Sequence, residues 1–198
     1  MNGINELRAE INRFFNPSLR TDDERETIVS LSGRYQVTWD VYRLDDATRN
    51  WSVSDVIVTD LLDSTEVARF IRSDDRFWSC WIEREEAEYL VCSEALDGQT
   101  VIDLTHRQMA SWCGSDRENG FIWVEYFPSP TGQRLAVIGC YWACPYEVVV
   151  YDFTSPMNLP LTELARADVQ PDTKVIWQSD AFIAYRSPSG DEMTLPIE

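Results

Sequence analysis

The chain has 198 residues, of which 44% are hydrophobic, and a formal net charge of -17 at pH 7. This length suffices for one well-buried core and is short for two domains. The charge argues against nucleic acid and anionic membrane surfaces as partners, because both bind positively charged surfaces.

The sequence indicates a reduced, intracellular protein. No charged segment followed by an apolar one marks the N-terminus as a cleaved signal peptide. No apolar run approaches the roughly 18 residues of a membrane-spanning helix. Five cysteines in a chain without such a signal favour free thiols over a disulfide framework. We therefore expect a cytoplasmic protein.

Residues 1–19 are predicted to form an amphipathic helix that packs on the rest of the domain. Apolar side chains recur there at spacings of three and four residues, at Ile4, Leu7, Ile11 and Phe14. A helix that binds a partner or a second copy is the alternative, although an apolar stripe usually packs on its own domain. Residues 20–26 are predicted to be a charged linker.

From residue 27 to residue 198, short apolar runs alternate with polar turns, which predicts a single β domain of about four antiparallel units. The best supported strand pair follows the turn Ser129-Pro130-Thr131-Gly132. The first strand is an apolar run that follows this turn and ends near Gly139. The second is a β-branched and aromatic run from Glu147 to Phe153.

The units recur at roughly forty-residue intervals with similar ends and turns. Thr100-Val101-Ile102-Asp103-Leu104 parallels Val149-Val150-Tyr151-Asp152-Phe153, and the turn at 129–132 parallels Ser187-Pro188-Ser189-Gly190. Strands that end in apolar-Asp-apolar, and Ser-Pro-x-Gly turns, resemble blades of a WD40-type β-propeller.

A second resemblance lies in Gly139-Cys140-Tyr141-Trp142-Ala143-Cys144-Pro145-Tyr146-Glu147 followed by Tyr151-Asp152-Phe153, which is similar to a signature of uncharacterised bacterial propeller-like proteins. The resemblance implies a binding scaffold and names no ligand. The chain lacks repeated Trp-Asp ends and Gly-His starts, and four units would make a small ring. An open, twisted antiparallel β-meander is therefore the alternative to a small propeller.

The loop in this stretch is the predicted binding surface. Tyr141, Trp142, Pro145 and Tyr146 offer large aromatic contact areas with polar groups, as protein interfaces often do. Cys140 and Cys144 are weak metal candidates, because two thiolates supply only half of a tetrahedral zinc site. Small buried thiols are the favoured interpretation, and no cofactor is predicted.

No catalytic residue is predicted. His106 is the only histidine and lies in an expected turn, where a solvated side chain is the simplest interpretation. Neither a Gly-x-Ser-x-Gly elbow nor a glycine-rich phosphate loop is present. Asp103 and Asp152 follow apolar strands and are expected to accept hydrogen bonds from turn backbones. The carboxylates from Glu83 to Glu88 are interpreted as solvated turn charges.

The sequence favours a non-enzymatic protein-interaction module, whose acidic surface binds a protein partner, such as a basic one, as an adaptor or inhibitor. A small enzyme or metal-binding protein that uses carboxylates or Cys140 and Cys144 is the first alternative. Mimicry of nucleic acid is the second. Unpaired sheet edges offer a further route to homo-oligomers.

Overall fold

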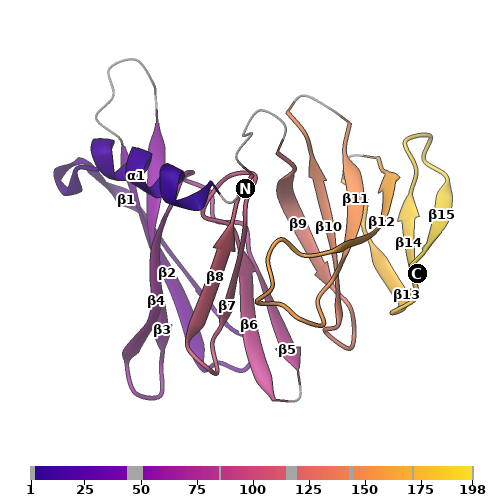
Figure 1. Ribbon diagram of the computed structural model, residues 1–198, viewed down its shortest axis with the longest axis horizontal. Helices are drawn as coiled ribbons and strands as arrows, with labels where there is room; N and C mark the ends of the chain where they lie inside the picture. The colour runs from indigo at the N-terminus through magenta and orange to yellow at the C-terminus, as the bar shows by residue number, and fades with distance from the viewer. Residues whose placement is uncertain are drawn as a thin grey trace.

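The computed structural model describes residues 3–43, 51–84, 86–114, 120–142, 145–170 and 172–197. These residues form one α-helix, a short 3-10 helix and four antiparallel sheets (Figure 1), named sheets A to D in chain order. None of the helices in these ranges has the length and apolar character needed to cross a membrane.

Each sheet is a meander in which successive strands pair with one another. Sheet A contains β1 (Arg20–Val29), β2 (Tyr35–Arg43), β3 (Ser52–Asp60) and β4 (Thr65–Arg72). Sheet B contains β5 (Cys80–Arg84), β6 (Ala87–Cys92), β7 (Gln99–Asp103) and β8 (Gln108–Trp112). Sheet C contains β9 (Ile122–Pro128), β10 (Arg134–Cys140), β11 (Glu147–Asp152) and β12 (Glu163–Asp168). In the described residues sheet D contains β13 (Ile176–Ser179), β14 (Phe182–Arg186) and β15 (Glu192–Pro196).

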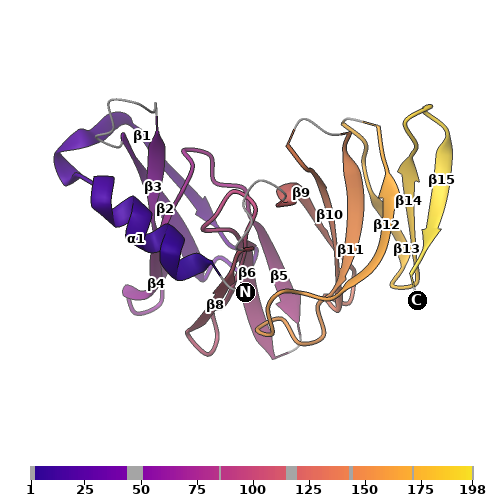
Figure 2. The ribbon, with the colours of Figure 1, turned by 45° about the horizontal axis from the view of Figure 1, so that its top comes forward.

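The sheets stand face to face in chain order, with sheet A at one end of the row and sheet D at the other (Figures 1 and 2). Strand β5 lies beside β9, and β4 lies beside β8, so neighbouring sheets are stacked in the same orientation. The prediction of a mostly-β fold with about four antiparallel units and one N-terminal helix is confirmed. Of the two arrangements left open by the sequence, the structure shows the open row.

Three apolar layers fill the spaces between neighbouring sheets. The layer between sheets A and B includes Val37, Trp39, Val56, Leu90 and Ile102. The layer between B and C includes Val91, Val101, Trp123, Val137 and Val149. The layer between C and D includes Ile138, Val148, Val150, Val175 and Ile183. Because successive strand side chains point to opposite faces, the apolar run of β10 is buried on both sides.

The helix α1 (Ile4–Phe14) packs on the sheets, as predicted. Its buried face consists of Ile4, Leu7 and Ile11, which share a cluster with Val53 of sheet A and Cys113 after β8. The helix is followed by the 3-10 helix η1 (Pro17–Leu19), which Pro17 opens. This contact joins the N-terminus of the chain to sheets A and B.

The predicted charged linker over residues 20–26 was wrong, because these residues lie in β1. Glu26 pairs with Trp39, and the Arg20 guanidinium lies 2.6 Å from the Asp40 carboxylate on β2. β1 is an edge strand, where charged side chains are well tolerated because one side faces water. Pairing with the next strand, β2, makes it a strand, whereas its charged composition alone indicated a linker.

Three equivalent turns open the second strand of a pair. In the turn after β9, the Gly132 amide donates to the Ser129 carbonyl and the Arg134 amide donates to the Ser129 hydroxyl. The turn at Ser30 repeats both bonds, and in the turn at Ser187 the hydroxyl accepts from an amide one residue earlier, that of Asp191. Each has a glycine with positive φ, at Gly33, Gly132 and Gly190, where a side chain would be strained.

Candidate functional site

Tyr141, the first of the four residues predicted to bind a partner, lies in an aromatic pocket between sheets B and C. The pocket has a volume of about 280 Å³, and its aromatic lining consists of Trp112, Phe121, Trp123, Tyr141 and Tyr151. Arg166 of β12 extends over two of these rings, with its guanidinium carbon 5.3 Å from the ring centre of Phe121 and 5.6 Å from that of Tyr141. Such stacking stabilises a cation.

Arg166 is neutralised by carboxylates of this chain. Its Nε and Nη2 atoms donate to Glu163 over 2.9 and 2.7 Å, and Nη1 donates to Glu147 and to the Tyr141 hydroxyl. The hydrogen bonds to Glu163, then those to Glu147 and Tyr141, raise the pKa of Arg166 above its usual value. Tyr141 is therefore engaged in a contact within the chain.

The other three predicted binding residues do not join Tyr141 in one surface. Trp142 is 57% exposed and Pro145 is exposed, whereas Tyr146 packs against the layer between sheets C and D. The binding role of Trp142 and Pro145 stays a prediction.

Of the two weak metal candidates, Cys140 is a half-buried thiol, and Cys144 lies outside the described residues. Within the described ranges no group of three or more His, Cys, Asp or Glu side chains has the arrangement of a metal site. The remaining thiols include Cys92, which is fully buried, and burial raises its pKa above the usual range.

His106 lies in the turn after β7, with 60% of its side chain exposed, as predicted. Asp103 holds the turn: its carboxylate accepts the His106 amide over 2.9 Å and lies 2.9 Å from His106 Nδ1. Asp152 likewise accepts the Thr154 amide over 2.9 Å. Both aspartates thus accept turn hydrogen bonds as expected. In the described part of the chain, no serine, threonine or cysteine side chain is hydrogen-bonded to His106.

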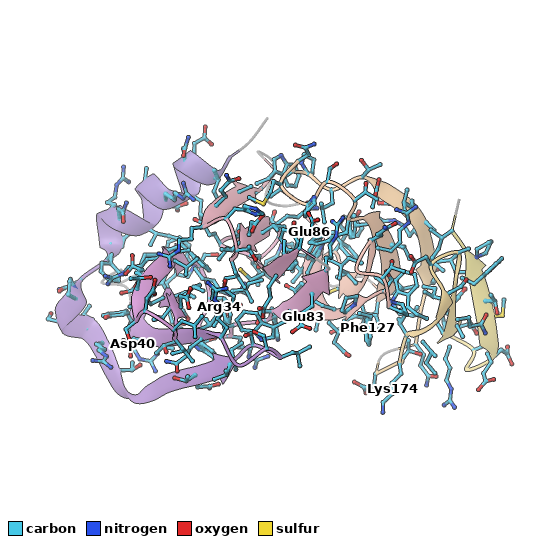
Figure 3. All side chains as sticks on the ribbon, turned by 90° about the horizontal axis from the view of Figure 1, so that it is seen from below. Arg34, Asp40, Glu83, Glu86, Phe127 and Lys174 are labelled. Carbon is cyan, nitrogen blue, oxygen red and sulfur yellow. The ribbon has the colours of Figure 1, made fainter. Side chains whose placement is uncertain are left out.

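The turns after β1, β3, β5, β7 and β9 lie along one side of the row, at the ends of the strands, and this side is called the hairpin face. Figure 3 looks onto this side, where Arg34, Glu83 and Glu86 are labelled. Contacts between turns of different sheets tie it together. Ser32 of sheet A donates to Glu88 of sheet B over 2.8 Å, and Arg84 of sheet B donates to the Phe153 carbonyl of sheet C over 3.1 Å.

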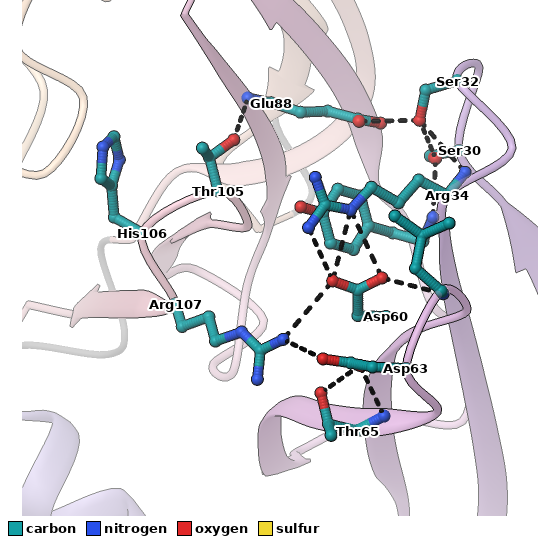
Figure 4. A network of polar contacts seen from close by, with 12 residues as sticks. Ser30, Ser32, Arg34, Asp60, Asp63, Thr65, Glu88, Thr105, His106 and Arg107 are labelled. Carbon is teal, nitrogen blue, oxygen red and sulfur yellow. Dashed lines mark hydrogen bonds and ion pairs between the residues drawn. The ribbon is translucent and has the colours of Figure 1, made fainter.

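An ion-pair network fixes the sheet A part of the hairpin face to sheet B (Figure 4). Asp60, whose side chain is only 1% exposed, accepts from Arg34 over 2.8 Å, and Arg107 lies 3.5 Å from it. Arg107 also donates to Asp63 over 2.8 Å. The Arg34 guanidinium holds the pKa of Asp60 below its usual range. The Thr65 hydroxyl and then Arg107 lower the pKa of Asp63 to about 2.

Exposed aliphatic side chains surround this network, in a set called the tip patch: Val29, Leu31, Leu61 and Leu62. Leu31 is 79% exposed and Leu62 is 77% exposed. Their two turns are neighbours, because the Leu61 amide donates to the Arg34 carbonyl over 2.8 Å. Exposed aliphatic groups gathered on rigid turns are typical of interaction surfaces.

A groove of about 810 Å³ lies on the hairpin face between sheets B and C, and is called the hairpin groove. Its lining includes Glu83, Glu86, Tyr89, His106 and Pro130. Glu83 and Glu86 are exposed and have no ion-pair partner among the described residues. The groove thus combines two carboxylates that have no ion-pair partner with the cation Arg84, a tyrosine and a histidine.

Sequence reasoning assigned no function to the tip patch or the hairpin groove. The tip patch had one local signal, since Leu31 and the Leu61-Leu62 pair are aliphatic residues within turns. The groove had none, because Glu83 of β5 and His106 belong to sheet B, whereas Pro130 belongs to a turn of sheet C.

The comparisons with known proteins give a sequence relative and structural neighbours, and no family. No family model matches. An uncharacterized protein, R762 of Acanthamoeba polyphaga mimivirus, is 25% identical over 143 residues, which cover 72% of this chain. The chain spans 56% of that relative's length. The sequence resemblance pointed to bacterial proteins, whereas this relative is viral.

Two solved β-sheet structures are similar at low scores. The β-propeller domain of Cps50 (Swd1) from Myceliophteria thermophila is 11% identical, with a TM-score of 0.34, over 87% of this chain and 74% of that one. TolB from Acinetobacter baumannii is 10% identical, with a TM-score of 0.28, over 88% of this chain and 55% of that one.

Proposed function

We propose that this protein is a non-enzymatic interaction module that binds a basic segment of a protein partner at the hairpin face. The observation that carries the proposal is that the hairpin groove and the tip patch both lie on the hairpin face. The free carboxylates of Glu83 and Glu86 supply the charge, and the tip patch supplies apolar contact.

Glu83 and Glu86 differ from Asp60, Asp63 and Asp103 of this face because no ion pair within the described residues occupies their carboxylates. Asp60 and Asp63 are neutralised by arginines, and Asp103 is held by His106. The nearby cation Arg84 donates to the carbonyls of Phe153 and Thr154 instead of to a carboxylate. A cationic segment therefore meets in the groove two carboxylates that no ion pair holds, beside the single cation Arg84. The net charge of -17 attracts such a segment to the chain.

The face is also held in one arrangement before binding. Arg34, Asp60 and Arg107 fix the turns of the tip patch to sheet B. Arg84, next to Glu83 in β5, donates to the Phe153 carbonyl of sheet C. Turns that are already ordered lose little conformational entropy when a partner binds, so more of the contact energy contributes to affinity.

Binding of a short fluorescent peptide in which Arg and Leu alternate tests the proposal. The Glu83→Gln, Glu86→Gln double variant should weaken binding by roughly 3- to 10-fold at low salt, as expected for two partly screened charges. Wild-type affinity should fall when salt is raised to roughly 0.5 M, because the Debye length shortens. Fluorescence anisotropy measures both effects.

The matched control removes the same charge elsewhere. Glu66→Gln with Glu125→Gln changes two exposed carboxylates on β4 and β9 that do not line the groove. This control should retain affinity within about twofold. Equal weakening by both double variants would show attraction to the whole acidic chain without a site. Amide chemical shifts should change at Glu83, His106 and Thr131, and changes spread over all sheets would contradict the proposal.

An adaptor or an inhibitor of a basic protein would both use this site, and a cytoplasmic location suits either role. The small-enzyme, metal-binding and nucleic-acid-mimic alternatives have no comparable observation in their favour among the described residues.

A further inference from the structure

The outer face of sheet D, which points away from sheet C, is apolar and open to solvent. Ile176, Ala184 and Thr194 form one cross-strand row on it, and Phe182 pairs with Pro196 in the next. Ile176 is 62% exposed and Phe182 is 44% exposed. The opposite face carries Ile183 and Leu195, which pack toward sheet C.

The same face has a hollow of about 580 Å³ with balanced charge. Lys174 and Arg186 provide two cations, and Asp172 and Glu192 provide two carboxylates. In the described part of the chain, none of the four has an ion-pair partner. This neutral patch stands out on a chain of net charge -17, most of whose surface repels an identical chain.

We propose that a second copy of this chain packs on the outer face of sheet D, outer face against outer face. A two-fold axis brings the same patch of both copies together, so the patch must be complementary to itself. This one is: the cations Lys174 and Arg186 of each copy meet the carboxylates Asp172 and Glu192 of the other. Ile176 and Phe182 supply the apolar centre.

The free edge of β15 fits less well than the face as the point of contact. The Ile197 amide donates to the Ala181 carbonyl over 2.9 Å. Because backbone hydrogen bonds alternate along an antiparallel pair, the backbone amide positions and carbonyls of Glu192, Thr194 and Pro196 point toward the free edge of β15. Pro196 has no amide hydrogen to donate there. A second strand could therefore pair with only part of this edge, whereas sheets pack face to face at about 10 Å.

Sedimentation velocity between about 1 and 200 µM measures the expected monomer–dimer equilibrium. The Ile176→Asp, Phe182→Asp double variant should raise the dissociation constant at least about 10-fold, since it places charge in the apolar centre. The control, Val29→Asp with Leu31→Asp, makes the same change at exposed aliphatics of the hairpin face and should leave dimerisation unchanged. A wild-type chain that stays monomeric throughout this range overturns the proposal.

Charge reversal tests the face without touching its apolar centre. Arg186→Glu alone and Glu192→Arg alone should each weaken the dimer, and the two together should restore it within about threefold, because the pairs reform with reversed polarity. Both residues are exposed, so folding should be retained. Failure of the double variant to recover overturns the proposed contact, even if the double aspartate variant proves unfolded.

Carbodiimide cross-linking locates the contact directly, because Lys174 is the only lysine in the chain. In a mixture of isotope-labelled and unlabelled copies, mixed-isotope peptides should join Lys174 to Asp172 or Glu192. Mixed cross-links at carboxylates of other sheets would contradict this contact. The proposal does not rest on the hairpin face, and failure of one leaves the other standing.

Discussion

Sheets A and D occupy equivalent places at the two ends of the row, yet their outer faces differ. On sheet A, α1 covers Val53 and Ile71, and polar pairs such as Arg69 with Asp55, 2.6 Å apart, occupy the surface below. On sheet D, Ile176 and Phe182 are exposed. A stack of sheets needs a polar or covered face at each end. The described chain supplies such a face at sheet A only.

The largest expected effect comes from removing the cover of sheet A. Leu7 is 2% exposed in the contact between α1 and the sheets. Leu7→Asp should lower the free energy of unfolding by about 3–5 kcal/mol, because it deletes apolar contact and buries a charge. Urea unfolding followed by tryptophan fluorescence measures it. Ala9→Asp, on the exposed side of α1, should change stability by no more than about 0.5 kcal/mol. Equal losses of unfolding free energy in the two variants would mean that Leu7→Asp acts through helix propensity and not through the contact between α1 and the sheets.

A smaller effect is expected from the ion pair that holds this cover in place. Arg8 donates to Glu94 over 2.6 and 2.8 Å, and the Glu94 side chain is 1% exposed. Arg8→Ala should cost about 1–3 kcal/mol, since it leaves a buried carboxylate without its cation. Combining it with Glu94→Gln should cost less than the sum of the single changes. Strict additivity in urea unfolding would contradict the coupling.

Hydrogen exchange compares the two ends of the row without mutation. In dilute solution, amides of β14 in sheet D should exchange at least about 10-fold faster than those of β10 in sheet C. The reason is that β10 is buried on both faces, whereas β14 is covered on one. If a second copy covers sheet D, protection of β14 should rise with protein concentration while that of β10 stays constant. Equal protection in dilute solution would contradict the difference.

The smallest effect concerns the acid sensitivity of the hairpin face. The pKa of Asp63 is lowered from 3.8 to about 2, by the Thr65 hydroxyl and by Arg107. A lowered folded-state pKa gives stabilisation that is present above pH 3.8 and is lost as the pH falls toward 2. Arg107→Gln should therefore lower the melting temperature by about 1–3 °C at pH 6.

At pH 2 the melting temperatures of wild type and Arg107→Gln should converge, as circular dichroism can show. A difference that persists unchanged at pH 2 would assign the role of Arg107 to packing instead of charge. Arg76→Gln is a suitable control, because Arg76 is exposed and has no ion-pair partner among the described residues.

Local chemistry explains which parts of the fold could be predicted. The turns at Ser129 and Ser187 depend on bonds within about five residues, and both were predicted. Asp103 and Asp152 bond to amides two or three residues away and were also predicted. Strand β1 was missed because its partner strand, not its own composition, makes it a strand.

The candidate site could not be predicted in the same way. The hairpin groove joins Glu83 and His106 of sheet B to Pro130 of sheet C, and these residues have no common sequence pattern. Tyr141 was recognised as an unusual aromatic residue, but its contact with Arg166 arises only when β12 folds beside β11.

The sequence by itself determined the number of units, the N-terminal helix, the repeated serine-glycine turns and the negative net charge. These features depend on composition or on bonds between residues close along the chain. Only the tertiary structure decided that the row is open, that α1 covers sheet A, and that the outer face of sheet D is left exposed. Those outcomes depend on which sheet faces which, and side chains far apart in sequence set that order through packing.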